Sequence, residues 1–375
     1  MRRRAFLGIP AASAFSFSAD SAPVPRYKVV SAYKSQAGQG MPGLFPGSVV
    51  SVHSNTSIDE TTEKVNAPAV AQMVAEGMKT LCGVKDPRDA WRRFFTPQDV
   101  VGIKVNCSGA PGIMSTPAVV AEIVRNLVAV GVRTEQVYIY ERFQNQLDSV
   151  NYAAHVPQGV KIVAMEGFWR GSSRNYDPKT YVEVDFFGED DTRSNLARLV
   201  CDPLTKIINV PNMKDHGASG VTGCLKNIAY GSFSNVARSH SDARTHTLSF
   251  IGTLAAVEPL RSKTVLQIMD GLRGVWHGGP FSPSRRYRFY PKQMMFGTDP
   301  VSIDRLLLDI IENKRKAEGA LSVWDRSTAH VKRGGLDSPP DVNRYIREPG
   351  HIEYASKLGL GVYDVAKIHV KKIEL

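Results

Sequence analysis

The stretch I-I-N-V-P-N-M-K-D-H-G-A-S-G-V-T-G-C-L-K-N-I-A-Y-G, residues 207–231, decides the fold and holds many of the side chains that could carry chemistry. It opens with an apolar run, Ile207 to Val210, of the kind that forms a buried strand, and Pro211 ends that run. Charged residues and spaced glycines follow, and we expect a helix to begin near Ser219. A strand that passes through a polar, glycine-rich turn into a helix is where open α/β sheets place ligands.

Two lysines flank the glycines of this stretch, Lys214 before them and Lys226 after them. In the expected helix Thr222 and Lys226 lie four residues apart and share a face. Free N–H groups at the helix start and two ammonium groups would suit a phosphate, a sulfate or a carboxylate. The alternative is that the lysines are solvated and the glycines only shape a turn. The pattern G-x-x-x-x-G-K-[ST] is absent, which argues against nucleotide hydrolysis of the P-loop type.

Strand-like and helical patterns alternate along much of the chain. The strand-like runs are 49–53, 100–106, 137–140, 160–165, 207–210, 264–269 and 293–296, and the clearest helical patterns are 67–81, 117–130 and 300–316. This rhythm implies parallel strands joined by helical crossovers. We therefore expect an α/β fold with a mostly parallel, Rossmann-like sheet flanked by helices, an irregular N-terminal segment and a C-terminal extension.

Four regions follow from these patterns. Residues 1–21 are expected to be a signal peptide, 22–48 an irregular segment rich in proline and glycine, 49–320 the α/β domain, and 321–375 an extension that packs on the same domain. Residues 38–43 match G-x-G-x-x-G, but no convincing strand precedes them, so we interpret them as a loop.

The N-terminus begins M-R-R-R-A-F-L and continues through a mildly apolar stretch into small residues. Arg3, Arg4, Phe6 and Leu7 match the core of a twin-arginine signal, with cleavage expected after Ser21. The alternative is a disordered basic N-terminus. A signal of this type predicts a periplasmic or extracellular protein and makes the twin-arginine export machinery a partner. Because such substrates cross the membrane folded, it also favours a cofactor without naming one.

Composition and charge narrow the class of protein. With 42% hydrophobic and 22% charged residues, the chain resembles soluble globular proteins. No apolar run approaches the roughly 18 residues of a bilayer span, so no stable span is expected after signal removal. The net charge of +11 fits an anionic ligand, but no basic block with interleaved aromatic residues indicates nucleic-acid binding.

The four cysteines, at positions 82, 107, 201 and 224, form no C-x-x-C pair, so an iron–sulfur cluster held within one loop is not expected. An oxidising compartment would allow a disulfide, although the spacing gives no pairing.

Polar side chains recur where the expected strands end. They are Lys104, Asn106, Glu141, Lys214, Asp215, His216, Asp270 and Asp299. In a parallel sheet these ends share one edge, where distant residues can converge. Asp270 is either a ligand-facing carboxylate or a turn residue, and Asp299 is interpreted as the N-cap of the following helix.

Three histidines, His216, His240 and His246, fall within a short span. A divalent metal held by His216, His240 and Asp270 is conceivable, but the spacing is not diagnostic. The alternative is that the histidines are hydrogen-bonded, structural or acid–base groups. Two neighbouring lysines should keep His216 neutral, which would suit a general base.

Several motifs in a fixed order carry a family resemblance. They are V-G-I-K-V-N (101–106), S-T-P (115–117), I-I-N-V-P-N-M-K-D-H (207–216), V-T-G-C-L-K-N (221–227), I-M-D-G-L (268–272), G-G-P (278–280) and G-T-D-P-V-S-I-D (297–304). Over about residues 95–310 the chain resembles the domain of unknown function 362 family. The resemblance implies a shared polar set: Lys104, Asn106, Lys214, His216, Lys226, Asn227, Asp270 and Asp299. Some relatives carry ferredoxin-like cysteine clusters, which this chain lacks.

The sequence thus predicts an exported enzyme that acts on a small anionic substrate, with or without the help of a metal, through a reaction that the residues do not specify. The predicted substrate-binding residues are Lys104, Asn106, Lys214, Lys226 and Asn227, and the predicted catalytic residues are His216 and Asp270. One alternative is a non-catalytic periplasmic protein that binds an anion or a metal. A second is a redox protein, which would need a coloured cofactor.

Overall fold

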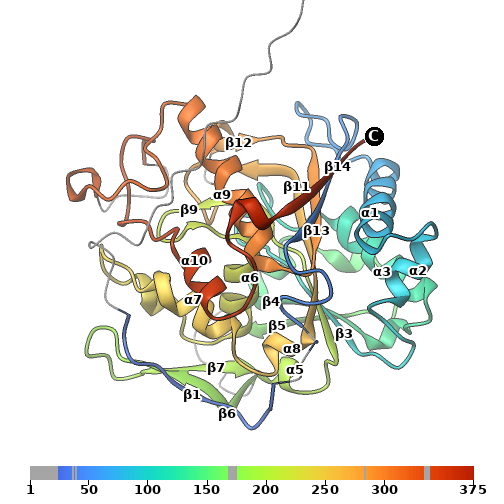
Figure 1. The fold of residues 1–375 in the computed structure, drawn as a ribbon, viewed down its shortest axis with the longest axis horizontal. Helices are drawn as coiled ribbons and strands as arrows, with labels where there is room; N and C mark the ends of the chain where they lie inside the picture. Colours follow the sequence, from blue (N-terminus) through green and yellow to red (C-terminus); the bar gives the residue numbers. More distant parts are fainter. Residues whose placement is uncertain (1–23, 36–37, 39, 168–174, 283, 333–337) are drawn as a thin grey trace, which may run out of the picture.

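The computed structural model describes residues 24–35, 38, 40–167, 175–282, 284–332 and 338–375 (Figure 1). The expected signal peptide, residues 1–21, lies outside them.

Eleven strands of the described chain form the main sheet, whose continuous path runs β14-β2-β13-β11-β8-β3-β4-β5. These strands are β2 (Ser48–His53), β3 (Val101–Lys104), β4 (Val137–Phe143), β5 (Lys161–Glu166), β8 (Lys206–Asn209), β11 (Thr264–Val275), β13 (Gln293–Gly297) and β14 (His369–Glu374). Off this path, β9 (Asn212–His216) and β12 (Arg288–Phe289) pair with β11, and β10 (Gly220–Val221) pairs with β9.

Five neighbouring strands, β5-β4-β3-β8-β11, run parallel. Numbered by their order along the chain, they lie in the order 3-2-1-4-5, which is that of a Rossmann fold. The direction of winding reverses between β3 and β8, so the crevice where such sheets bind ligands lies beyond Lys104 and Asn209. The predicted mostly parallel, Rossmann-like sheet is confirmed, with β13 antiparallel to both of its neighbours.

Helices cover both faces of the sheet (Figure 1). One buried core joins the sheet to α1 (Ala67–Cys82), α2 (Pro87–Arg92), α3 (Pro117–Ala129) and α4 (Gln144–Asp148). The other joins it to α5 (Arg198–Cys201), α6 (Gly223–Ser232), α7 (Thr247–Ala255), α8 (Leu260–Lys263), α9 (Pro300–Ala317) and α10 (His351–Lys357). The sheet is therefore buried on both faces, as its continuous apolar strands require.

A second, antiparallel sheet of three strands lies at the bottom of the view in Figure 1. It consists of β1 (Lys28–Val30), β6 (Tyr176–Glu183) and β7 (Arg193–Ala197). Two of its strands, β6 and β7, come from the segment between β5 and β8.

Local sequence explains where the longer helices begin and end. Asn66 caps α1 by accepting the N–H of Ala69, and Gly83 ends this helix in the left-handed region, at φ 65°. Asp299 caps α9 by accepting the N–H of Ser302 at 2.9 Å, which confirms the predicted cap. None of the described helices combines the length and the apolar character of a membrane span.

The expected helix start near Ser219 is wrong. Residues 212–216 continue as strand β9, and β10 folds back on it, with Asp215 opposite Val221 and His216 opposite Gly220. The helix begins only at Gly223, whose φ of 57° favours glycine; a Cβ there would lie 2.2 Å from Oδ1 of Asp304. The lysine and histidine of this stretch are thus held in a hairpin rather than in a flexible turn.

The expected free N–H groups at the start of α6 are also not free. The carboxylate of Asp304, on α9, accepts the N–H of Cys224 at 2.5 Å and that of Leu225 at 2.9 Å. The protein therefore places one of its own carboxyl groups at this helix N-terminus, where a ligand anion was expected.

Replacing Asp304 with Asn should destabilise the fold. An amide offers one acceptor oxygen where the carboxylate offers two, so one buried N–H of α6 loses its partner, at a cost of about 1–3 kcal/mol. Asp309→Asn on the same helix is the control, because Asp309 is exposed and paired only at the surface with Arg305. Urea denaturation measures both variants; equal midpoints would show that Asp304 does not hold α6.

Candidate functional site

A cavity of about 350 Å³ lies at the crevice between β3 and β8. Its walls come from the ends of β3 and β4, from β9, from α6 and the short helix Ala237–His240, and from residues 277–281 and 338–347. Of the predicted substrate-binding and catalytic residues, five line the cavity: Lys104, Asn106, His216, Lys226 and Asn227. His240 lines it as well, whereas Lys214 and Asp270 are not among its lining residues.

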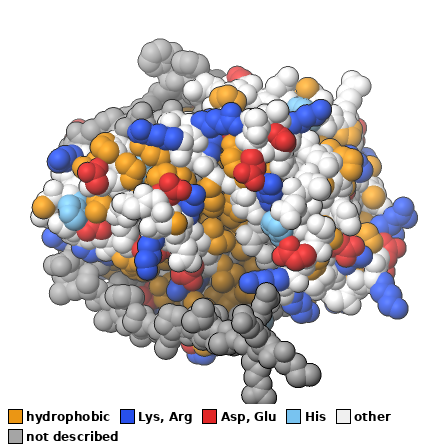
Figure 2. Space-filling model, turned by 90° about the horizontal axis from the view of Figure 1, so that it is seen from above, with side chains coloured by type: hydrophobic (Ala, Val, Ile, Leu, Met, Phe, Trp, Pro, Cys, Tyr) orange, Lys and Arg blue, Asp and Glu red, His pale blue; other side chains and the backbone are white. Residues whose placement is uncertain are grey.

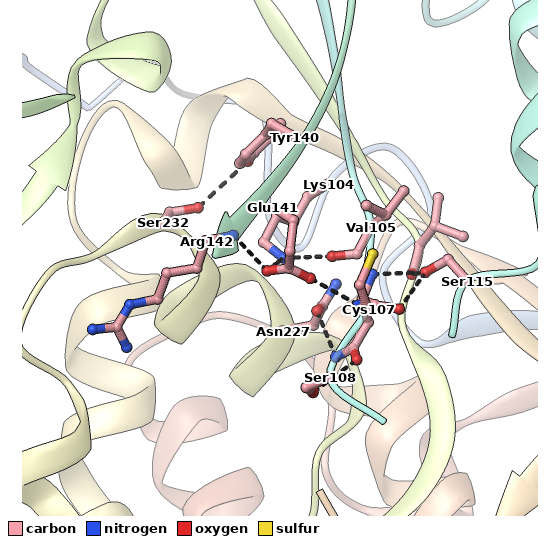
Figure 3. Close-up of polar contacts among 12 residues, drawn as sticks. Lys104, Val105, Cys107, Ser108, Ser115, Tyr140, Glu141, Arg142, Asn227 and Ser232 are labelled. Atoms are coloured by element: carbon pink, nitrogen blue, oxygen red, sulfur yellow. Dashed lines mark hydrogen bonds and ion pairs between the residues drawn. The ribbon is translucent and has the colours of Figure 1, made fainter. Parts of the chain in front are cut away.

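The buried ammonium group of Lys104 is paired with a carboxylate of the protein. Its Nζ lies 2.8 Å from Oε1 of Glu141 and also donates to the carbonyl of Val105 (Figure 3). The second oxygen of Glu141 accepts the N–H of Cys107 at 2.9 Å. Gly231 of α6 makes room for this lysine, because a Cβ there would lie 1.8 Å from its Cε.

Three asparagines connect the floor of the cavity to the sheet. The side chain of Asn106 donates to Asn227 at 2.9 Å, and Asn227 donates to Asn209 at 2.7 Å. Asn209 in turn donates to Gln267 on β11, at 2.7 Å. All four side chains are buried, so this network fixes α6 against β3, β8 and β11.

Lys214 lies behind the cavity wall with its charge surrounded by acceptors. Its Nζ donates to Oδ1 of Asn106, to the hydroxyl and carbonyl of Ser108 and to the carbonyl of Pro280, at 2.6–3.0 Å. Burial lowers the pKa of Lys214 to about 7. This lysine therefore organises the wall and offers no open face to a ligand.

Lys226 has a different environment. Within the described part of the chain, no hydrogen bond or ion pair holds its ammonium group, which lies 4.5 Å from the centroid of the Tyr230 ring. The side chain is buried, and burial, together with the charges of Lys214 and Arg142, lowers its pKa to about 7. Thr222, four residues earlier, also lines the cavity, and its buried hydroxyl has no hydrogen-bond partner among the described residues. Both are unsatisfied polar groups that a ligand could satisfy.

His216 is positioned as a hydrogen-bond donor. Its Nδ1 accepts the N–H groups of Ala218 and Ser219, at 3.1 and 3.2 Å, so the neutral ring carries its proton on Nε2. Burial, followed by the nearby charge of Lys226, holds the pKa of His216 well below its usual value. A ring in this tautomer has no free lone pair, so the geometry does not favour the predicted general base.

His240 has the opposite tautomer. Its Nδ1 donates to the carbonyl of Ala237 at 2.6 Å, which leaves the lone pair on Nε2. Its ring centroid lies 5.6 Å from that of His216. Burial, then the charge of Lys226, lowers the pKa of His240 to about 3. The cavity thus combines one neutral imidazole that donates with another that accepts.

Asp270 lies away from this pair. Strand β11 runs to Val275, beyond the predicted 264–269, so Asp270 is inside the strand rather than at its end. Its carboxylate accepts the N–H of Thr116, the N-cap of α3, at 2.7 Å and that of Leu272 at 3.2 Å. This aspartate connects α3 to the sheet, and burial raises its pKa.

The structure does not bring together the trio proposed as metal ligands, His216, His240 and Asp270. Among the described residues, no group of three or more His, Cys, Asp or Glu side chains is arranged to hold a metal ion. All four cysteines are free thiols, with Cys82, Cys107 and Cys224 buried and Cys201 half-buried.

Sequence reasoning missed the C-terminal wall of the cavity. Arg347 reaches back to the buried carboxylate of Asp215, which also lies 3.5 Å from Arg315 of α9. Arg344 and Tyr345 of the same segment line the cavity too. These residues follow no strand or helix pattern, and no local signal points to them.

A comparison with known protein families gives one match. A model described as "Domain of unknown function (DUF362)" matches residues 101–309, more than half of the chain. The chain belongs to the DUF362 family. The matched region of this DUF362 protein contains β3, β9, α6 and Asp304, and it ends before the segment that carries Arg344 and Arg347.

Other comparisons add little. No curated protein matches this DUF362 chain. A crystal structure of a Thermotoga maritima protein, from the Northeast Structural Genomics Consortium, is similar over 56% of this chain and 51% of that one, with 9% identity and a TM-score of 0.31. The DUF362 protein therefore spans about half the length of that neighbour, and a likeness this low supports no statement about function.

Gly231→Ala should disturb the Lys104 site. The new methyl group would overlap the buried lysine, and overpacking of this kind costs about 1–3 kcal/mol. Gly217→Ala, also at the cavity, is the control, since its Cβ would meet its nearest neighbour, Tyr345, at an ordinary 3.7 Å. We expect that control within about 1 kcal/mol of wild type in urea denaturation. Equal stability of the two variants would contradict the tight packing of Lys104 on α6.

Proposed function

We propose that this DUF362 protein is an enzyme that binds a small anionic substrate in the cavity between β3 and β8. The observation that carries the proposal is the buried Lys226 ammonium group, which faces the cavity without an acidic partner in the described chain. Burying an unpaired charge is costly, and a bound anion would remove that cost.

The charge balance of the lining supports an anion. Five cationic side chains and two carboxylates line the cavity: Lys104, Arg142, Lys226, Arg344 and Arg347, against Glu141 and Asp215. Both carboxylates already pair with cations of the protein. The excess is therefore positive where a ligand would bind.

Arg142 is the natural partner of Lys226 in holding the anion. Its Nε lies 2.8 Å from Oε1 of Glu166, and the Tyr176 hydroxyl, which donates to the same carboxylate oxygen, also interacts with the guanidinium group. In Figure 3 its side chain extends away from the Lys104–Glu141 pair. A guanidinium group in this state can bind a carboxylate or a phosphate through two parallel hydrogen bonds.

The cavity also suits a small molecule rather than a macromolecular surface. Its volume of about 350 Å³ is at the lower end of the range for ligand sites. On the face in Figure 2, basic and acidic side chains are interspersed, so the net charge of +11 forms no continuous basic patch on that face. In the proposed site His216 donates a hydrogen bond to the substrate from Nε2, and Nε2 of His240 accepts a hydrogen bond from it.

Sulfate binding tests the site, because sulfate keeps its charge across neutral pH. We expect sulfate to stabilise the wild-type protein in thermal denaturation, and Lys226→Met to weaken its affinity at pH 6.5 at least ~10-fold, corresponding to the ~1.5–3 kcal/mol of a charged hydrogen bond. Lys85→Met, an exposed lysine far from the cavity, is the control. Equal affinities of all three proteins for sulfate would contradict the proposal.

The same affinity should fall as the pH rises. The pKa of Lys226 is lowered to about 7, so the cation that binds sulfate is present below pH 7 and is lost above it. Affinity should then approach a tenfold loss per pH unit by pH 8–9. Lys226→Arg keeps its charge and should flatten this slope, leaving only the contribution of Lys214. An unchanged slope in Lys226→Arg would assign the titration to another group.

The proposal includes export, for which the R-R-x-F-L pattern at residues 3–7 is the support. In a bacterium with a twin-arginine pathway, the wild-type protein should appear in the periplasmic fraction. Replacing both Arg3 and Arg4 with Lys should leave it in the cytoplasm, because the signal is read through this pair. Equal export of the two proteins would contradict a twin-arginine signal.

A further inference from the structure

We propose that Lys226 is a nucleophile that forms a Schiff base with the carbonyl group of a small oxo-acid, whose carboxylate Arg142 holds. This inference rests on the proposed function and names the class of substrate and the kind of chemistry. The family match gives no reaction and therefore neither supports nor contradicts this inference.

The contacts of the three buried lysines support this choice. Lys104 is bound to Glu141, and Lys214 donates to acceptors of three residues. The Lys226 ammonium group makes no hydrogen bond or ion pair with the described residues and lies over the Tyr230 ring, and the side chain lines the cavity. Its amine can therefore reach the carbon of a bound carbonyl group without breaking a bond inside the protein.

The groups around Lys226 favour the neutral amine. The charged groups that act on it are Lys214 of β9 and Arg142 of β4, both cationic. His216 and His240 are neutral, and burial, with a smaller effect of the Lys226 charge, lowers the pKa of His351 of α10 to about 4. With a pKa of about 7, roughly half of the Lys226 side chains carry a nucleophilic lone pair at neutral pH.

The reaction needs no oxidant, reductant or metal. The neutral Lys226 nitrogen attacks the carbonyl carbon, a C–N bond forms, and one hydrogen of the amine passes to the carbonyl oxygen. When the C=N bond forms and the C–O bond breaks, the second amine hydrogen passes to the same oxygen, which leaves as water. His216 can stabilise the charge on that oxygen by a hydrogen bond from Nε2, and Nε2 of His240 can accept a hydrogen bond from the amine.

The aromatic surroundings fit an organic ligand. Phe143, Tyr230, Phe281 and Tyr345 line the same cavity as the cations. Phe143 lies beneath the Arg142 guanidinium, 4.7 Å from its carbon, and Phe281 is 37% exposed although it lines the cavity. A charged carboxylate end and an apolar remainder would match this lining.

Reductive trapping tests the inference on the full-length protein. The protein is incubated with glyoxylate and sodium cyanoborohydride, the imine is reduced to a stable carboxymethyl group, and each lysine is quantified by peptide mass spectrometry. At pH 7 we expect Lys226 to be labelled at least ~10-fold faster than the exposed Lys85, since an ordinary lysine is almost wholly protonated there. Labelling should rise from pH 6 to pH 8, opposite to sulfate affinity, and sulfate should protect Lys226 but not Lys85.

Lys226→Arg is the matched variant. It keeps the charge but cannot form the imine, so sulfate binding should persist while the carboxymethyl adduct in the cavity disappears. If Lys226 of the wild-type protein is labelled no faster than Lys85 while sulfate still binds, the Schiff base is wrong and the anion site stands. If sulfate does not bind and Lys226 is not labelled, both proposals are wrong.

Discussion

The cavity depends on the buried carboxylate of Asp215. It lies between the guanidinium groups of Arg315 and Arg347, and its second oxygen accepts the N–H of Gly279 at 3.3 Å. One side chain of β9 therefore joins α9, the loop after β11 and the C-terminal segment. Removing it would leave two buried cations unpaired, which is far costlier than losing an exposed ion pair. Because Lys214 and His216 are its immediate neighbours, the same contact fixes the strand that builds one wall of the site.

Helices and strands whose apolar residues recur at regular spacing were predictable from the sequence. The stretch 207–231 contains elements that lack such spacing and were not predicted correctly. Helix α1 has apolar residues at helical spacing, and the residues that cap its two ends, Asn66 and Gly83, directly flank it. Its range was therefore predicted to within one residue. Strand β9 is charged and short, and its pairing with β11 is a long-range contact that produces no regular apolar spacing in the local sequence. The glycine-rich segment after β9 was interpreted as a turn that leads into a helix, whereas β9 and β10 form a hairpin there. The strand order around β3 and β8 likewise depends on pairing, which a local pattern does not encode.

The residue types of the site were easier to predict than their roles. Lys214 and Lys226 look alike in sequence, yet one is surrounded by acceptors and the other has none among the described residues. That difference comes from Ser108 and Pro280, which approach only in the folded chain. Asp270 was expected at a strand end because apolar residues stop at Met269, but pairing with β13 and β9 extends the strand beyond it. Arg347 acts on a residue 132 positions away, so no motif could join the two.

The position of Asp304 has a consequence for how this protein can change. In many Rossmann-like sheets a helix N-terminus holds the ligand through backbone N–H groups, which no substitution can remove. Here an aspartate of the protein occupies that position at α6, so in the proposed site the side chains around the cavity would recognise the ligand. Single substitutions at the rim can then alter the charge or shape of the accepted molecule while the backbone keeps its fold. A common scaffold could in this way serve different substrates among proteins that share the β3–β8 crevice.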